Sequence, residues 1–200
     1  MFYHINGIVS ELEPNLAVIE CGGVGFEINI TMTTAGMLSI GEKAKLYISE
    51  AIGENNFDLY GFKTKNDKRC FEMLISVSGI GPKAAMSILS HNSPESLALA
   101  IMNDDIKALT VAPGIGKKIA QRVILELKDK ISKETSDIRD IQIPVAAQSA
   151  VQNSAVNDAL IGLSVLGYSN AEINPVLKTL DISSMTAEEI IKAVLKKMVK

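Results

Sequence analysis

The chain has 200 residues, of which 47% are hydrophobic and 22% are charged, a composition typical of folded globular proteins. No apolar run approaches the ~20 residues of a membrane helix, and the first residues lack the segments of a signal peptide, so we expect neither feature. Cys21 and Cys70 are isolated and only two histidines occur. These counts argue against a disulfide framework, a metal site, a cofactor or a catalytic triad, and they favour the reducing cytoplasm.

The net charge of −3 is distributed unevenly along the chain. Residues 1–62 carry a net charge of −6, residues 63–132 carry +4, and residues 133–200 carry −1. A local basic surface, rather than the overall charge, is what attracts a nucleic acid. We therefore expect DNA to meet the central segment and to be kept away from most of the acidic first segment.

Residues 1–62 alternate between apolar and polar side chains, a pattern that predicts strands. We expect five of them, separated by Gly, Pro and Asn turn signals, at residues 3–9, 16–20, 24–30, 44–48 and 57–62. Five short strands suit a small closed barrel of the OB type. Such barrels often bind single strands through basic and aromatic residues. Because this segment is acidic, we expect it to lack such a face and to serve as a scaffold for assembly.

Two nearly identical stretches lie thirty-five residues apart: Gly79-Ile80-Gly81-Pro82-Lys83 and Gly114-Ile115-Gly116-Lys117-Lys118. Each predicts a helix that stops at a Gly-x-Gly turn and restarts as a second helix with Lys in its first turn. The first N–H groups of a helix have no intrahelical partner, and with a nearby ammonium they form a phosphate site that reads no base. One such turn alone is more often an ordinary connection between helices. The doubling favours tandem helix-hairpin-helix DNA binding, and the spacings of nucleotide-binding loops are absent.

The remaining chain is predicted to be helical on both sides of a linker. Residues 64–131 are expected to be helical throughout, with one helix starting at Pro94 and another spanning residues 117–131. Residues 132–153 lose helical periodicity and predict a mobile linker. The last fifty residues predict three helices, with capping boxes at Ser169/Glu172 and Thr186/Glu189 and a helix end at Gly167. So small a bundle on a tether favours a docking module.

The order and spacing of these features resemble the RuvA family, the Holliday-junction-binding subunits of the bacterial branch-migration machine. Besides the paired hairpins, the resemblance rests on Ile5-Asn6-Gly7-Ile8-Val9, on Leu59-Tyr60-Gly61-Phe62 and on Leu166-Gly167-Tyr168. It covers essentially the whole chain. It implies an OB-fold barrel for tetramerisation (1–63), a tandem helix-hairpin-helix DNA-binding domain (64–132), a flexible linker (133–153) and a three-helix RuvB-interacting domain (154–200).

The resemblance also implies a function in recombination and DNA repair. A homotetramer would bind four-way DNA junctions without regard to sequence and would recruit the RuvB hexameric ATPase, which hydrolyses ATP, so that this chain is no enzyme. The RuvC resolvase is a further candidate partner, and the number of tetramers per junction, one or two, stays open. The implied DNA-binding residues are Gly79, Ile80, Gly81 and Lys83 in the first hairpin, and Gly114, Ile115, Gly116, Lys117, Lys118 and Arg122 in and after the second.

The family usually places two acidic residues, the acidic pin, on a hairpin at the centre of the tetramer, where they are thought to repel phosphates. The matching positions here are Glu54 and Asn55, so a tetramer would carry four such charges in place of eight. Repulsion between exposed charges is screened within about 8–10 Å, so the substitution would weaken an already local effect. Asp58 lies in a predicted strand and is not expected to substitute.

Two other functions fit parts of the sequence. A base-excision glycosylase follows its hairpin with a catalytic acid some twenty residues later, and Asp137 follows Lys118 at nearly that distance. Asp137 falls in the expected linker, however, and few aromatic residues follow residue 71 to hold a flipped base. The other alternative is a non-enzymatic duplex or single-strand binder with no junction preference.

Overall fold

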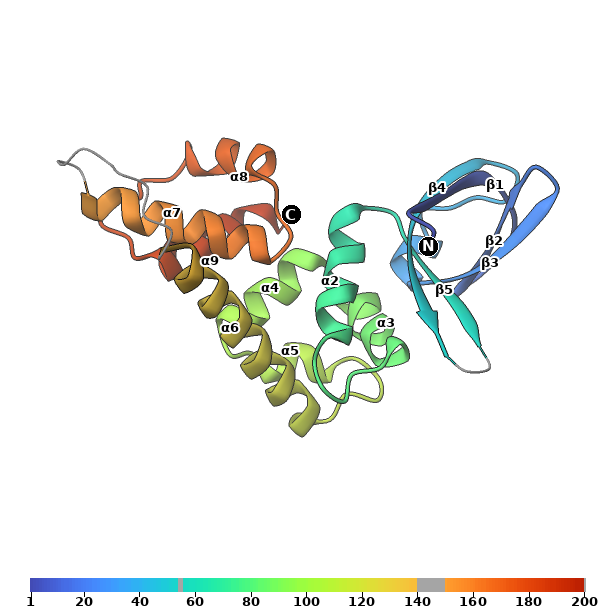
Figure 1. Cartoon of the computed structure of the whole chain (residues 1–200), viewed down its shortest axis with the longest axis horizontal. Helices are drawn as coiled ribbons and strands as arrows, with labels where there is room; N and C mark the ends of the chain where they lie inside the picture. The colour runs from blue at the N-terminus through green and yellow to red at the C-terminus, as the bar shows by residue number, and fades with distance from the viewer. Residues whose placement is uncertain (54–55, 140–149, 200) are drawn as a thin grey trace. The chain divides into compact units, whose positions relative to one another are not determined.

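The computed structural model describes residues 1–53, 56–139 and 150–199, and for residues 131–139 and 150–154 it describes the backbone only. The chain forms two compact units (Figure 1). The first unit comprises Met1–Ser93 and Val111–Ile115, and the second comprises Pro94–Thr110 and Gly116–Lys200. Each unit is described below by itself.

The first unit contains the predicted barrel. Its strands are β1 (His4–Glu13), β2 (Leu16–Cys21), β3 (Val24–Ile30), β4 (Lys43–Ile52) and β5 (Phe57–Phe62). They close in the order β1-β2-β3-β5-β4, and only the β3–β5 pair is parallel. The alternating apolar residues fill the interior, where Ile19, Ile28 and Leu46 are fully buried. The sequence prediction of a five-stranded barrel is confirmed.

A short helix, α1 (Met32–Ala35), follows β3 and was not predicted. The Thr31 hydroxyl accepts a hydrogen bond from the Thr34 N–H at 3.1 Å and caps its first turn. Four residues are too few to show a helical period, so only the capping threonine could have indicated this element.

Among the described residues there are eight longer helices: α2 (Lys65–Ile75), α3 (Pro82–His91), α4 (Pro94–Met102), α5 (Ile106–Thr110), α6 (Lys117–Arg139), α7 (Ala150–Val165), α8 (Asn170–Leu177) and α9 (Ala187–Met198).

In the first unit α2 packs on the barrel. The Phe71 ring lies 5.0 Å from the rings of both Tyr60 and Phe62. The hairpin formed by α2 and α3 is thereby joined to the β4–β5 end of the barrel.

In the second unit, α4 and α5 pack on α6, α7 packs on α6, and α9 packs on α4. Five of the nine α4 residues are buried, three of them in succession from Ala100 to Met102, so α4 is covered on more than one side. These contacts group α4–α6 with the C-terminal helices, whereas α2 and α3 belong with the barrel. The compact units therefore divide the chain inside the predicted tandem helix-hairpin-helix segment.

The expectation that helical structure ends at Ile131 needs correction. Helix α6 continues to Arg139, and α7 begins at Ala150, so both ends of the expected linker are helical. No Gly or Pro interrupts the chain between residues 131 and 139, and Pro144 is the first helix breaker. The loss of apolar periodicity there removes the signal for burial but does not itself end a helix.

Three helices close their own N-termini with a carboxylate at the third helical position. The Glu189 carboxylate accepts the Thr186 N–H at 2.8 Å before α9, and the Glu172 carboxylate accepts the Ser169 N–H at 2.8 Å before α8. Both predicted boxes are confirmed. A third box, Thr64 with Asp67, opens α2. The predicted helix end at Gly167 is also confirmed by its φ of 107°.

Candidate nucleic-acid interface

The first Gly-x-Gly turn joins α2 to α3. Gly79 has a φ of 86°, a backbone conformation that residues other than glycine rarely adopt. The Ile80 N–H then donates to the Val77 carbonyl at 3.0 Å, and the Ala85 N–H donates to the Gly81 carbonyl at 3.1 Å as α3 begins. The chain therefore reverses within a few residues and presents the start of α3 at the end of the turn.

The second turn, between α5 and α6, repeats this geometry position by position. Gly114 has a φ of 83°. The Ile115 N–H donates to the Ala112 carbonyl at 3.1 Å, and the Ala120 N–H donates to the Gly116 carbonyl at 3.0 Å. The sequence repeat is thus a repeat of backbone structure, which confirms the two predicted hairpins as folded elements.

The isoleucine between each pair of glycines points into the protein. Ile80 and Ile115 are only 6% and 5% exposed, and their N–H groups are used inside the turns. Their side chains therefore anchor the turns. Of the residues singled out from sequence, the structure places these two side chains inside the protein and not on its surface.

At the second glycine of each turn, neither the backbone angle nor the surrounding atoms require the residue to be glycine. Gly81 has a φ of −90°, and the φ of Gly116 is not in the positive range either. A Cβ added at Gly81 or Gly116 would meet no described atom within 4 Å. Glycine at such an open position fits a backbone that another molecule approaches closely.

The N-termini of α3 and α6 lack the caps that α2, α8 and α9 possess. Gly81 makes no side-chain cap, Gly116 has no side chain, and neither helix has an acidic residue in its first turn. The third helical positions, occupied by carboxylates in the capped helices, are Ala84 and Ile119. The N–H groups and the positive dipole end at each hairpin therefore stay available to an outside anion.

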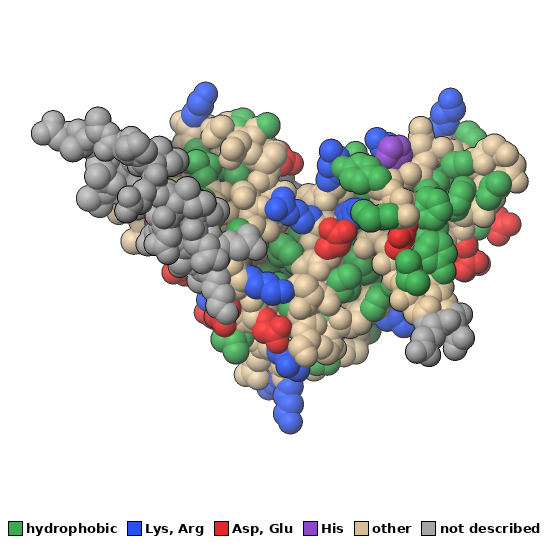
Figure 2. All heavy atoms as spheres, in the orientation of Figure 1, with side chains coloured by type: hydrophobic (Ala, Val, Ile, Leu, Met, Phe, Trp, Pro, Cys, Tyr) green, Lys and Arg blue, Asp and Glu red, His purple; other side chains and the backbone are tan. Residues whose placement is uncertain are grey.

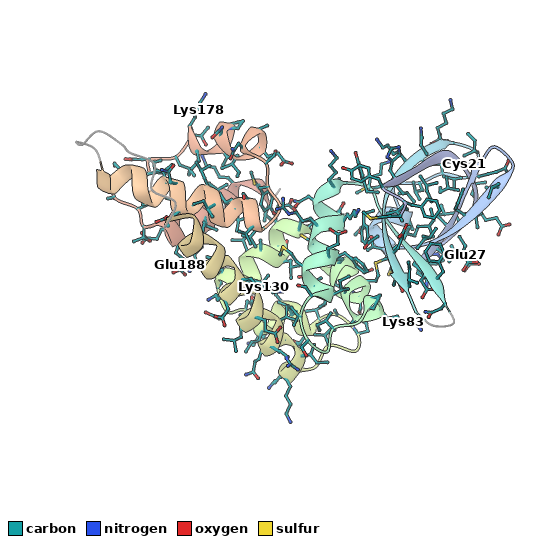
Figure 3. All side chains as sticks on the ribbon, viewed as in Figure 1. Cys21, Glu27, Lys83, Lys130, Lys178 and Glu188 are labelled. Atoms are coloured by element: carbon teal, nitrogen blue, oxygen red, sulfur yellow. The ribbon has the colours of Figure 1, made fainter. Side chains whose placement is uncertain are left out.

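Exposed lysines surround both uncapped starts. Lys83 lies in the first turn of α3, and Lys117 and Lys118 open α6. Within the described part of the chain, none of these three lysines forms an ion pair, and Figure 3 shows Lys83 projecting from the start of α3. The two sites differ in one respect, because Pro82 removes an N–H that Lys117 supplies in the second hairpin.

Arg122, also singled out from sequence, already has a partner. Its Nε donates to Glu126 Oε1 at 2.8 Å, one helical turn further along α6. More than half of the Arg122 side chain is exposed, so the pair is of the weak, solvent-screened kind. The pair occupies only one of the five N–H donors of the guanidinium, so Glu126 competes with a phosphate for Arg122 without excluding it.

The positions of the expected acidic pin, Glu54 and Asn55, lie outside the described residues. Next to them, the Asn56 amide donates to Asp58 Oδ2 at 2.9 Å. Burial, followed by the charge of Asp58, raises the pKa of the Tyr60 phenol. Asp58 and Tyr60 line an open groove that Gly81, Pro82 and Lys83 border from the other side. The β4–β5 hairpin and the first helix hairpin thus share one groove within the first unit.

One contact at the hairpins could not be found from sequence. The Ser87 hydroxyl of α3 donates to the Pro113 carbonyl at 2.8 Å and fastens the second turn to the first unit. The two residues are twenty-six positions apart, and the acceptor is a backbone atom, so no residue pattern marks the pair.

The barrel also departs from one expectation. It was expected to lack a basic–aromatic face, but lysines lie over tyrosine rings beside β1 and β4. Lys45 lies 5.2 Å from the centre of the Tyr47 ring, and Lys68 lies 5.2 Å from that of Tyr3. The expectation was wrong because the net charge of a segment does not show how its charges are distributed over a folded surface.

The described residues contain no group of three His, Cys, Asp or Glu side chains placed to hold a metal ion. Among the same residues, no helix is both long and apolar enough to cross a membrane. Asp137, the acid considered for a glycosylase, belongs to helix α6 and not to a linker.

Comparison with known proteins matches three family models in succession along the chain. The model of the RuvA N-terminal domain matches residues 1–61, that of the SAM-like helix-hairpin-helix tandem matches residues 71–129, and that of the RuvA C-terminal domain matches residues 154–199. The order of the matches is the order predicted from sequence.

Curated relatives match over nearly the whole length. A protein of Acetivibrio thermocellus named Holliday junction branch migration complex subunit RuvA is 43% identical over 98% of both chains. A protein with the same name from Thermoanaerobacter sp. strain X514 is 40% identical over all of both chains. Another from Ruminiclostridium cellulolyticum is 39% identical over 99% of this chain and 100% of the relative. The chain belongs to the RuvA family.

Proposed function

We propose that this protein is a non-catalytic subunit that binds four-way DNA junctions through their phosphates and takes part in branch migration during recombination and repair. Its relatives are named as subunits of a Holliday junction branch migration complex, which supports the junction as the target. Phosphate contacts carry no sequence information, so binding is expected to be independent of sequence.

The single observation that carries the proposal is the pair of uncapped helix starts. Both α3 and α6 begin after an open glycine, without an acid in the first turn and with exposed lysine beside the free N–H groups. The phosphate-binding residues proposed are Gly79, Gly81, Lys83, Gly114, Gly116, Lys117 and Lys118, with Arg122 as a contact for which Glu126 competes. Ile80 and Ile115 hold the turns.

A homotetramer is the assembly we propose, with the barrel as its main contact. Hydrophobic side chains gather on one face of the barrel (Figure 2). Phe2 lies 5.7 Å from Phe26 and 6.2 Å from Phe57 between ring centres, and Ile52, which pairs with Phe57, is 73% exposed. An exposed apolar patch of this kind indicates a protein contact. Glu54 and Asn55 follow Ile52 closely in the chain, which supports placing them near such a contact.

The C-terminal helices are proposed to recruit the RuvB ATPase, which would supply ATP hydrolysis. The match of residues 154–199 to the RuvA C-terminal domain supports a separate role for this segment. We propose the functional division into residues 1–63 for assembly, 64–132 for DNA, 133–153 as connection and 154–200 for the ATPase. RuvC remains a further candidate partner.

The proposal is tested by comparing a four-way junction with a linear duplex of equal length and base composition in a gel-shift titration. The junction should be bound more tightly, and junctions of unrelated sequence should be bound equally. Light scattering on the same protein should give four copies. Equal affinity for junction and duplex would reduce the function to general duplex binding, and a monomer at micromolar concentration would remove the proposed assembly.

A further inference from the structure

The first unit carries a second basic surface, whose residues precede both hairpin turns in the sequence. It is built from β1, β4 and the first turns of α2, and we name it the β1–β4 edge. Its members are Tyr3, His4, Lys43, Lys45, Tyr47, Lys65 and Lys68. Figure 2 shows basic side chains beside hydrophobic-class side chains where the barrel meets the start of α2.

Strand register brings four of these residues, His4, Lys43, Lys45 and Tyr47, to one outer face. In β4, Ala44, Leu46 and Ile48 are buried, so the alternate residues between them face outward. Tyr47 pairs with His4 across the β1–β4 ladder, and Lys43 pairs with Ile8 on the same face. The polar and aromatic side chains of this face therefore lie on paired strands and not on loops.

Two tyrosine rings form the centre of the edge. Tyr3 and Tyr47 meet edge to face, with 6.0 Å between their ring centres. Lys45 and Lys65 both lie over the Tyr47 ring, at 5.2 and 5.9 Å, and Lys68 lies over the Tyr3 ring at 5.2 Å. Tyr3 is 53% exposed, so its ring is open to a ligand. Cation–π contacts at an exposed site are weak, so the exposed Lys45 and Lys65 can turn to a phosphate while their stems stay beside the ring. Lys68 is largely covered and is paired with Glu72.

The charge of the barrel is divided between its two sides. Both lysines of residues 1–62, Lys43 and Lys45, lie on the β1–β4 edge. On the β2–β3 side, Glu20 pairs with Gly25 and Glu27 pairs with Val18, and both carboxylates are exposed. Two acids lie beside the edge: Glu72 is 3.6 Å from Lys68, and Glu50 accepts the N–H of Phe2, the residue before Tyr3. A net negative barrel thus carries one locally positive, aromatic face.

We propose that the β1–β4 edge binds single-stranded nucleic acid, with an unpaired base stacked on Tyr3 and with the neighbouring phosphates held by Lys45 and Lys65. Bases in a duplex are already stacked on each other, so an exposed ring on a convex surface can accept only an unpaired base. A row of lysines beside such rings is the combination that tracks a single strand without reading its sequence. An acidic protein segment would use the lysines but would gain nothing from the rings.

The test compares two probes in fluorescence anisotropy titrations of the full chain: a 20-nucleotide oligo-dT, and an abasic 20-mer with the same phosphates. The unmodified protein should bind oligo-dT at least about fivefold more tightly, the lower end of what stacking one base contributes. Tyr3→Leu should remove this preference, and Tyr3→Phe should keep it. Lys45→Ala combined with Lys65→Ala should weaken both probes alike and lower the salt slope by about 1.4. Lys178→Ala combined with Lys192→Ala, in the C-terminal helices, is the charge-matched control.

Five results would overturn the proposal. The first is equal binding of both probes by the unmodified protein, and the second is a Tyr3→Leu protein that keeps the preference for bases. A Lys83→Ala/Lys118→Ala protein that loses the preference would assign it to the hairpins instead. Oligo-glutamate bound as tightly as oligo-dT would assign the edge to an acidic partner protein, and a smaller assembly of Tyr3→Leu in light scattering would assign it to contact between copies. Junction binding by the same variants, measured in parallel, tests the hairpin proposal separately.

Discussion

The helices of this protein begin in two different ways. Helices α2, α8 and α9 supply their own anion at the third helical position. There Asp67, Glu172 and Glu189 accept hydrogen bonds from the N–H of the N-cap residue three positions earlier. Helices α3 and α6 supply none and carry Lys83 or Lys117 and Lys118 in the first turn instead. The chain therefore closes these three helix starts with its own carboxylates and leaves the two hairpin starts without one.

The omission has an energetic consequence. A cation near the positive end of a helix dipole is unfavourable by about 0.3–1 kcal/mol, the reverse of the usual stabilising effect of an acid there. A bound phosphate would reverse this by satisfying the N–H groups and neutralising the lysines together. On the proposed function, the capped helices need no ligand, whereas the hairpin helices are expected to gain stability when DNA binds.

The largest effect is expected from the second hairpin. Replacing Lys117 and Lys118 together by Ala should lower junction affinity and reduce the slope of log K against log salt by about 1.8 per subunit, against about 0.9 for Lys83→Ala. Because these lysines oppose the dipole of α6, the melting temperature should stay equal or rise.

The matched control is Lys196→Ala with Lys197→Ala in the last turn of α9. There the lysines favour the dipole, and Lys197 donates to Thr179 Oγ1 at 2.8 Å. This variant should lose stability and keep its affinity for DNA. A pair of titrations and melting curves that showed the same pattern for both variants would remove the distinction between the two kinds of helix end.

The two glycines of one turn should respond oppositely to the same substitution. Gly114→Ala forces a side chain into a left-handed conformation and should lower the free energy of unfolding by about 1–2 kcal/mol. Gly116→Ala places a methyl group in open space, so stability should change little while DNA affinity falls. Chemical denaturation and anisotropy on both variants check this pair. Loss of stability in Gly116→Ala would mean that this glycine serves the fold.

Much of this organisation was accessible from sequence, for identifiable reasons. The strands, the two turns and the α8 and α9 capping boxes are local patterns, in which the residues that determine the structure lie within a few positions of each other. The 35-residue repeat even located Gly116, although its lack of steric need became clear only from the space around it.

Features built from distant residues were not accessible. The β1–β4 edge depends on the register that sets Tyr47 beside His4 and on α2 returning to the barrel through Phe71. The Arg122–Glu126 pair has a recognisable spacing of four, but the spacing alone does not say which partner Arg122 takes. The packing of α9 on α4 likewise has no local signal.

A smaller effect should follow from changing the partner of Arg122. Glu126→Gln removes the carboxylate that Arg122 Nε contacts at 2.8 Å and should raise junction affinity about twofold at low salt, in line with the ~0.3–0.5 kcal/mol of such a pair. Arg122→Ala should lower affinity. Competition titrations at two salt concentrations measure both. No change with either variant would exclude Arg122 from the DNA contacts.

The smallest effect concerns pH and the capped class of helix. The backbone hydrogen bond from Thr186, followed by its hydroxyl, lowers the pKa of Glu189. A carboxyl whose pKa is lower in the folded state stabilises the fold above its unfolded pKa and loses this contribution as pH falls through the folded value. Melting temperatures at pH 7 and pH 3 should therefore differ less in Glu189→Gln than in the unmodified protein. Glu188→Gln, which removes an exposed pair with Lys192, is the control and should behave like the unmodified protein.

The most direct test converts a hairpin helix into the capped class. Gly116→Asp places a carboxylate at the start of α6, where it can accept the free N–H groups, and Gly116→Asn provides a neutral cap of nearly the same shape. Thermal melting and anisotropy with a four-way junction should show that Gly116→Asp is as stable as the unmodified protein or more so, yet binds the junction much more weakly than Gly116→Asn does. Equal junction affinity for the two variants would contradict the claim that DNA phosphates bind at these helix starts.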